Sequence, residues 1–226
     1  MDFRLSSCIG IVTPNLDGAM QFYRDHMGMT LGSLEEGLVL EAGPMRMYLD
    51  PGPISKTIFE ILTLDLAASK AKLRFYGYEV IDWMGPGKTN LVRDPFGLEF
   101  NVYEQKEASW VEIVPDEHGY FRPMIGAAAS NVQQIAEFYS MVLQAPANRL
   151  SDGSLLISGG SVGMRVFDSE HDFPAVWLSH VAPVEQMIEG GAAFLDSQHQ
   201  LLRDPIGVCW SIEPRSESTK AAVHPI

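Results

Sequence analysis

The sequence predicts an α+β protein made of two similar halves, each holding two βαβββ units in series. Three observations support this fold class: two repeated motifs, a repeated order of strand and helix patterns, and a globular composition. Residues 91–97 read LVRDPFG and residues 201–207 read LLRDPIG. Upstream, residues 15–23 read NLDGAMQFY and residues 131–139 read NVQQIAEFY. Because both motifs recur in the same order, an internal duplication is indicated.

The first half starts with a short apolar strand over residues 8–13, which leads into Asn15. An asparagine suits the N-cap of a helix because its side chain accepts a hydrogen bond from a free backbone N–H. The following helix carries an apolar stripe at helical spacing, and Gly28 is placed to end it. The stripe consists of Leu16, Ala19, Met20, Tyr23 and Met27.

The remaining elements of the first half follow in order. We expect three short strands over residues 30–34, 38–41 and 46–49, and a further strand over residues 58–64. A helix over residues 67–76 is ended by Gly77, and a strand over residues 98–104 closes the half after the Arg-Asp-Pro motif.

The second half repeats this order. Strands are expected over residues 124–129, 175–181 and 208–213, with Asn131 as a helix N-cap and a shorter helix over residues 184–189. We therefore expect a first module over residues 1–105, a polar linker over 106–122, a second module over 123–213 and a loosely packed tail over 214–226.

Composition and charge limit the classes of partner that the protein is expected to bind. Of the 226 residues, 46% are hydrophobic and 20% charged, which is typical of a globular protein. The formal net charge of -13 repels phosphate, so neither nucleic acid nor an anionic membrane is an expected partner. Two cysteines are too few for a disulfide framework. With no signal-like N-terminus and no apolar run long enough to span a bilayer, we expect a cytoplasmic protein.

The Asn-x6-Phe-Tyr and Arg-Asp-Pro-x-Gly motifs, set in βαβββ units, resemble the vicinal oxygen chelate superfamily. This superfamily includes glyoxalase I, extradiol dioxygenases, and bleomycin and fosfomycin resistance proteins. The resemblance covers about residues 6–105 and 122–213. It implies that the four βαβββ units form two cupped mixed β-sheets with helices on the outside, and that each cup holds a site.

The resemblance also locates the positions where metal-dependent members carry histidine, glutamine or glutamate. In this chain they fall on Cys8 and Asn101 in the first module and on Met124 and Ser211 in the second, with two further positions within one residue of Phe59 and Val176. Hard metals prefer imidazole and carboxylate ligands. We therefore predict no cofactor. Iron, manganese, nickel or zinc enters only under an alternative in which the protein is a metal-dependent enzyme.

Strand side chains alternate between the two faces of a sheet, which predicts the lining of each cup. Counting from the ligand positions, we predict two sets of ligand-binding residues with a largely apolar character, typical of a small-molecule pocket. A shift of one residue would bring Glu60 into the first cup. The first set is Cys8, Gly10, Val12, Phe59, Ile61, Thr63, Glu99, Asn101 and Tyr103, and the second is Met124, Gly126, Ala128, Val176, Leu178, His180, Cys209, Ser211 and Glu213.

Few residues suggest catalysis. His180 and Glu213 share the predicted second cup, and a histidine beside a carboxylate can act as a general base. Cys8 and Glu60 are the candidates in the first cup. Residues 159–163 match G-x-S-x-G, but flanking strand patterns indicate a β-hairpin rather than a nucleophile elbow.

These observations leave three functional hypotheses. The leading one is a glyoxalase-like or bleomycin-resistance-like protein that binds a small, largely apolar or aromatic molecule without a metal centre of the family type. The second is an enzyme of the same superfamily, either a lyase or an extradiol-type dioxygenase with unusual metal ligands, or a metal-free enzyme. The third is a structural role with both cups packed shut. Whether a second copy of the chain completes a cup, as in a homodimer, is left open.

Overall fold

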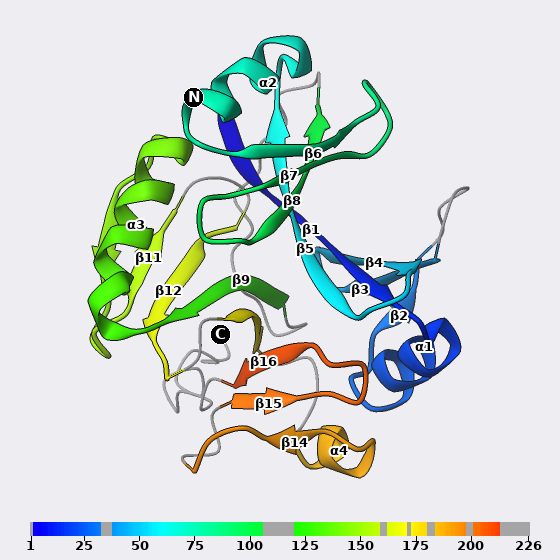
Figure 1. Ribbon diagram of the computed structural model, residues 1–226. Coiled ribbons are helices and arrows are strands. Elements are labelled where there is room, and N and C mark those ends of the chain that lie inside the picture. The colour runs from blue at the N-terminus through cyan, green and yellow to red at the C-terminus, as the bar shows by residue number, and fades with distance from the viewer. Residues whose placement is uncertain are drawn as a thin grey trace, which may run out of the picture.

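The computed structural model describes residues 2–32, 38–105, 120–158, 162–170, 173–179, 184–197 and 201–212. These residues form two eight-stranded mixed sheets and four helices (Figure 1). The predicted α+β class and the duplication are thus confirmed. The described helices are all too short or too polar to cross a membrane.

The first sheet has the strand order β2-β3-β4-β1-β5-β8-β7-β6. Its centre is the antiparallel pair β1 and β5, and each of these strands has a parallel neighbour, β4 and β8 respectively. The strands are β1 (Phe3–Thr13), β2 (Thr30–Leu31), β3 (Leu38–Ala42), β4 (Met45–Pro51), β5 (Lys56–Thr63), β6 (Glu79–Trp83), β7 (Asn90–Arg93) and β8 (Glu99–Glu104).

The second sheet repeats this order as β10-β11-β12-β9-β13-β16-β15-β14. Its central pair is β9 and β13, again antiparallel, with β12 and β16 as parallel neighbours. The strands are β9 (Tyr120–Ala127), β10 (Ala147–Arg149), β11 (Leu155–Ile157), β12 (Met164–Asp168), β13 (Phe173–Ser179), β14 (Ala193–Phe194), β15 (Leu201–Arg203) and β16 (Cys209–Ile212). The strands on either side of the G-x-S-x-G segment, β11 and β12, pair antiparallel, as the hairpin prediction requires, while residues 159–161 lie outside the described residues.

The helices begin as the sequence predicts in one half and differently in the other. Helix α1 (Leu16–Asp25) is capped by Asn15, whose Oδ1 accepts a hydrogen bond from the Gly18 N–H at 3.0 Å. The prediction that Asn131 caps the equivalent helix is wrong. Helix α3 (Ala129–Leu143) begins earlier and has Ala128 as its N-cap, so Asn131 lies within its first turn. The other helices are α2 (Leu66–Phe75) and α4 (Val184–Glu189).

The two repeated motifs contact each other across the boundary between the modules. Tyr23 of α1 donates a hydrogen bond from its hydroxyl to Asp204 of the second module at 2.8 Å. Reciprocally, the hydroxyl of Tyr139 of α3 donates to Asp94 of the first module. The Phe-Tyr motif of each half therefore supplies a donor to the Arg-Asp-Pro motif of the other half.

Each of these aspartates also accepts hydrogen bonds from the backbone of the turn that follows it in the sequence. Asp94 Oδ1 accepts the backbone N–H groups of Phe96 and Leu98 at 2.9 and 2.8 Å. Asp204 makes the same two contacts with the backbone that follows it, both at 2.9 Å, and its Oδ2 also accepts the Trp210 indole N–H at 2.9 Å. The two reciprocal tyrosine–aspartate hydrogen bonds thus link the β7–β8 turn to α3 and the β15–β16 turn to α1.

Aromatic packing surrounds both contacts and joins the two modules in one hydrophobic core. The Tyr23 ring meets the Trp210 ring edge-on at 6.0 Å, and the Tyr139 ring lies 5.9 Å from that of Phe100. All four side chains are fully buried. The tyrosine hydroxyls therefore lie where water cannot replace a lost hydrogen bond.

We expect Tyr23→Phe and Tyr139→Phe each to lower the free energy of unfolding by about 1–3 kcal/mol, because each leaves a buried carboxylate with one hydrogen bond fewer. Urea unfolding followed by fluorescence measures the change. Tyr103→Phe, at a side chain that is 41% exposed, is the matched control and should change stability by less than about 0.5 kcal/mol. Substitutions at 23 and 139 as neutral as the control would contradict this assignment.

Candidate functional site

The face of the first sheet that points away from its core is the first candidate site, here called the first open face. The register pairs Cys8 with Arg46, Gly10 with both Tyr48 and Ile58, and Glu60 with Asn101, so these residues share one face. The residues of this face include Cys8, Gly10, Val12, Arg46, Tyr48, Asp50, Lys56, Ile58, Glu60, Glu99, Asn101 and Tyr103. They are half-buried or exposed, whereas the intervening residues of the same strands are mostly buried.

The predicted positions on β1 and β8 lie on this face, but those on β5 do not. Phe59, Ile61 and Thr63 are at most 2% exposed and point to the opposite face. There the Phe59 ring packs against the Phe100 ring, and the Thr63 hydroxyl is 2.6 Å from the Ser69 hydroxyl of α2. The predicted register of β5 was wrong by one residue, so Glu60 takes the place predicted for its neighbours.

The second sheet shows the same one-residue shift. Val176 and Leu178 of β13 are buried on its core face. The opposite face carries Met124, Gly126, Cys209 and Ser211, as predicted, with Ala175 between Met124 and Cys209.

The two sheets differ in how far the residues at the centre of their open faces are exposed to solvent. Met124, Ala175 and Cys209 are at most 6% exposed, in contrast to half-buried Cys8 and Gly10 at the centre of the first face. His180 and Glu213, the predicted catalytic pair, lie outside the described residues. Among the described residues, the first open face is therefore the more accessible of the two.

A hydrogen-bonded polar cluster stands at the middle of the first open face. The Asn101 side-chain N–H donates to Glu60 Oε2 at 3.2 Å, and its Oδ1 accepts the Asn90 backbone N–H at 3.0 Å. A bulge in β1 between Leu5 and Ile9 brings Ser6 to the same place, where its hydroxyl accepts the Cys8 backbone N–H at 3.0 Å. Both ends of the Asn101 amide are thus engaged within the protein.

Burial changes the ionisation of this cluster. It raises the pKa of Glu60, against the effect of hydrogen bonds from Ser6, Asn101 and Cys8. Burial, with a smaller contribution from the nearby Glu60 carboxylate, also raises the pKa of the Cys8 thiol to about 11. At neutral pH, Cys8 is consequently a protonated thiol rather than a nucleophilic thiolate.

The cluster does not fit the hard metals that the superfamily resemblance implies. A neutral thiol and an amide whose oxygen already accepts a hydrogen bond are poor ligands for such an ion, which leaves Glu60 as the single strong one. The described part of the chain holds no group of three or more histidine, cysteine, aspartate or glutamate side chains able to bind a metal ion.

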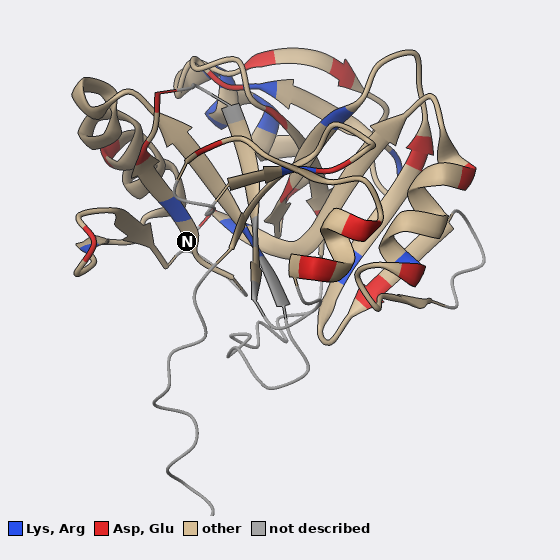
Figure 2. Ribbon diagram, turned by 90° about the horizontal axis from the view of Figure 1, so that it is seen from below, with Lys and Arg blue, Asp and Glu red and all other residues tan. Residues whose placement is uncertain are grey.

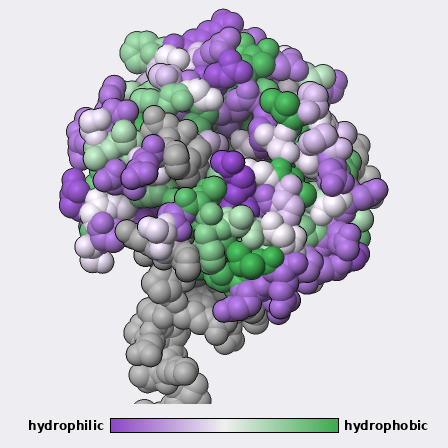
Figure 3. All heavy atoms as spheres, turned by 60° about the horizontal axis from the view of Figure 1, so that its bottom comes forward, coloured by the Kyte–Doolittle hydropathy of each residue, from purple (hydrophilic) through white to green (hydrophobic). Residues whose placement is uncertain are grey.

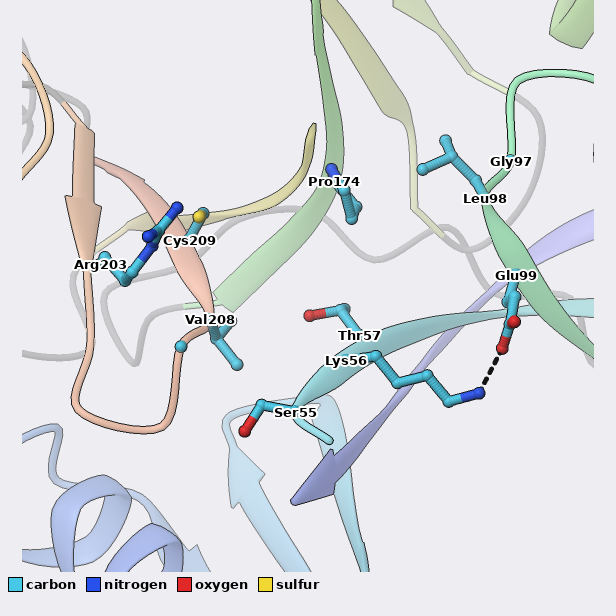
Figure 4. Close-up of a pocket in the computed structure, with 11 residues that line it drawn as sticks. Ser55, Lys56, Thr57, Gly97, Leu98, Glu99, Pro174, Arg203, Val208 and Cys209 are labelled. Atoms are coloured by element: carbon cyan, nitrogen blue, oxygen red, sulfur yellow. Dashed lines mark hydrogen bonds and ion pairs between the residues drawn. The ribbon is translucent and has the colours of Figure 1, made fainter. Parts of the chain in front are cut away.

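A pocket of about 320 Å³ lies between the two modules (Figure 4). In a space-filling view the molecular surface is hollowed, with hydrophobic and hydrophilic side chains together at the rim (Figure 3). Sequence reasoning assigned Glu99 and Cys209 to separate cups and missed that they line one pocket. The lining residues are Ser55, Lys56, Thr57, Gly97, Leu98 and Glu99 from the first module and Pro174, Arg203, Gly207, Val208 and Cys209 from the second.

The state of Cys8 can be tested by its alkylation rate in a Cys209→Ala background, in which it is the sole thiol. We expect the rate to rise with pH towards an inflection near 11. Adding Glu60→Gln should lower that inflection, because a negative charge that disfavours the thiolate is removed. An inflection near the ordinary value of about 8.5 in the folded protein, unchanged by Glu60→Gln, would contradict the burial argument.

Comparison with known proteins identifies the fold. No protein-family model and no curated protein sequence matches the chain. Among solved structures, the Mn(II)-bound glyoxalase from Novosphingobium aromaticivorans is similar, with a TM-score of 0.59, 16% identity, and coverage of 93% of this chain and 82% of that one.

Two further structures give the same result. Homoprotocatechuate 2,3-dioxygenase from Brevibacterium fuscum has a TM-score of 0.59 at 12% identity and covers 95% of this chain and 81% of its own. A mutant of 4-hydroxymandelate synthase from Streptomyces coelicolor has a TM-score of 0.61 at 10% identity, with 98% and 97% covered. The chain therefore has the two-module fold of the vicinal oxygen chelate superfamily, to which glyoxalases and extradiol dioxygenases belong.

Proposed function

We propose that the protein binds a small, largely apolar or aromatic molecule on the first open face, without a metal centre of the family type. The observation that carries this proposal is the cluster of Cys8, Glu60 and Asn101. These residues stand where the superfamily resemblance places metal ligands, and Asn101 is already satisfied by Glu60 and Asn90. A sheet face with a protein-satisfied cluster at its centre suits ligand binding better than Lewis-acid chemistry.

The lining supports the same proposal. A Cβ atom added at Gly10 would meet Ile58 Cβ at 3.6 Å, which is an ordinary van der Waals contact, and its backbone has no positive φ. The face next to Gly10 therefore has room that a larger side chain would fill. Val12 and Ile58 offer apolar contact, and Tyr48 and Glu60 offer polar groups that can orient a ligand.

A second candidate is a metal-free enzyme, favoured by the raised pKa of Glu60. A carboxyl group whose pKa is moved towards neutrality by burial can accept and return a proton. In this alternative Glu60 would be the general base on a ligand held by the same face. The observation favours proton transfer over metal-dependent lyase or dioxygenase chemistry.

We further propose that the partner of this protein is a small molecule and that the protein is located in the cytoplasm. A net charge of -13 disfavours phosphate-rich partners, so a small molecule is preferred over nucleic acid or membrane. Cys8 and Cys209 are both free thiols, which suits the reducing cytoplasm.

Metal content is the first test. We expect protein purified without chelators or affinity metal to carry well below one equivalent of iron, manganese, nickel or zinc by elemental analysis. Native mass spectrometry of the same sample would reveal a retained small molecule. Near-stoichiometric metal would overturn the metal-free proposal and favour a metal-dependent lyase or dioxygenase.

A pair of substitutions tests the location. Gly10→Phe should abolish the thermal stabilisation that aromatic ligands give the wild-type protein, because its side chain would occupy the first open face. Gly10→Ala adds only a methyl group at an ordinary contact distance and should retain the stabilisation. A folded Gly10→Phe variant with undiminished ligand response would exclude this face as the site.

A further inference from the structure

The two arginines of the repeated Arg-Asp-Pro motif have different surroundings. Arg93 is held by two carboxylates, Glu79 at 3.1 Å and Glu99 at 2.9 Å. These two glutamates are its partners in the sheet register on either side, one on β6 and one on β8. Arg93 is thus neutralised by its neighbours on the same face of the sheet.

Its counterpart Arg203 has neither of the two glutamate partners in its sheet register. The residues that flank it in the equivalent register are Ala193 on β14 and Cys209 on β16. The ion pairs of the described chain include no carboxylate for Arg203, and its side chain is exposed in the pocket between the modules. The arginine is therefore present in both halves, whereas the carboxylates that balance it flank the first arginine only.

The other charged residues of the pocket cancel each other. Lys56 Nζ lies 2.5 Å from Glu99 Oε2, so this pair adds no net charge. Arg203 is left as the uncompensated cation of the lining. In a protein of net charge -13, whose acidic residues are spread over the fold (Figure 2), a cation of this kind concentrates positive charge at one place.

The pocket is also polarised from one end to the other. Arg203 and Cys209 lie on one side, and Glu99 and Leu98 lie on the opposite side (Figure 4). Pro174, Val208 and Leu98 provide apolar lining. A ligand with one negative end would place that end at Arg203 and its apolar part towards Leu98, because Lys56 at the opposite side is already paired with Glu99.

We propose that this pocket, which adjoins the first open face and shares Lys56 and Glu99 with it, is a second binding site for a small organic monocarboxylate with a short apolar body. Arg203 pairs with the carboxylate, for which its planar guanidinium offers parallel N–H donors. Pro174, Val208 and Leu98 contact the body. The volume of about 320 Å³ is at the small end of ligand pockets and suits a single-ring molecule.

The test is a titration of the full chain with benzoate, followed by ¹H–¹⁵N NMR, with benzamide as the neutral molecule of the same shape. We expect benzoate to shift the amide signals of Gly207, Val208 and Cys209, and benzamide to bind about tenfold more weakly or worse. Arg203→Ala should weaken benzoate binding by a similar factor.

A restored ion pair provides the sharper variant. Ala193→Glu places a carboxylate opposite Arg203, as Glu79 stands opposite Arg93, and Ala193 is exposed, so the fold should tolerate the change. It should weaken benzoate binding without removing the arginine. Arg24→Ala is the control: Arg24 pairs with Asp25 on α1 away from the pocket, and its loss changes the net charge by the same amount as Arg203→Ala.

Several results would overturn the proposal. These are no detectable benzoate binding, equal affinity for benzamide, or undiminished affinity in the folded Arg203→Ala and Ala193→Glu variants. Shifts confined to Cys8 and Gly10 would place the ligand on the first open face. That outcome would refute the site between the modules while leaving the proposed function of the first face standing.

Discussion

The arrangement of this protein depends on two buried aspartates that each serve both modules at once. A carboxylate taken out of water is costly unless its oxygens accept hydrogen bonds. Asp204 meets this requirement with two backbone N–H groups of its own turn, the Trp210 indole and the Tyr23 hydroxyl. Because one donor comes from the other module, the turn is fully satisfied only when the modules are docked. Asp94 and Tyr139 impose the same condition in the opposite direction.

The two halves share these inter-module contacts and differ in the residues on their open faces and around the repeated arginine. Cys8 and Asn101 on the first face correspond to Met124 and Ser211 on the second, and the centre of the second face is buried. Around the repeated arginine, two glutamates in one half correspond to alanine and cysteine in the other. The contacts that join the modules have been retained, whereas the residues that could contact a ligand have diverged.

The sequence was sufficient to predict the duplication, the α+β class and the Asn15 cap, because these depend on local patterns. It was insufficient for the register of β5, where Ile58, Phe59, Ile61 and Leu62 interrupt any alternation and Glu60 is the sole polar residue between them. The position of Glu60 on the first open face becomes evident only from its pairing with Asn101. The pocket between the modules was not predicted either, since the repeat shows that its segments are equivalent but not that they lie side by side in the fold. The equivalence of Gly97 with Gly207 was the one available signal.

The pocket between the modules is lined by equivalent positions of the two halves, among them Gly97 and Gly207, Leu98 and Val208, and Glu99 and Cys209. Two identical subunits meeting at such a place would form a cavity with indistinguishable ends, and a ligand lacking two-fold symmetry would bind in two opposite orientations. When the two halves belong to one chain, the residues that line each end of the cavity can change independently of those at the other end. With a glutamate at one end and a cysteine at the other, the two ends of the cavity differ chemically. An asymmetric ligand can therefore bind in a single orientation.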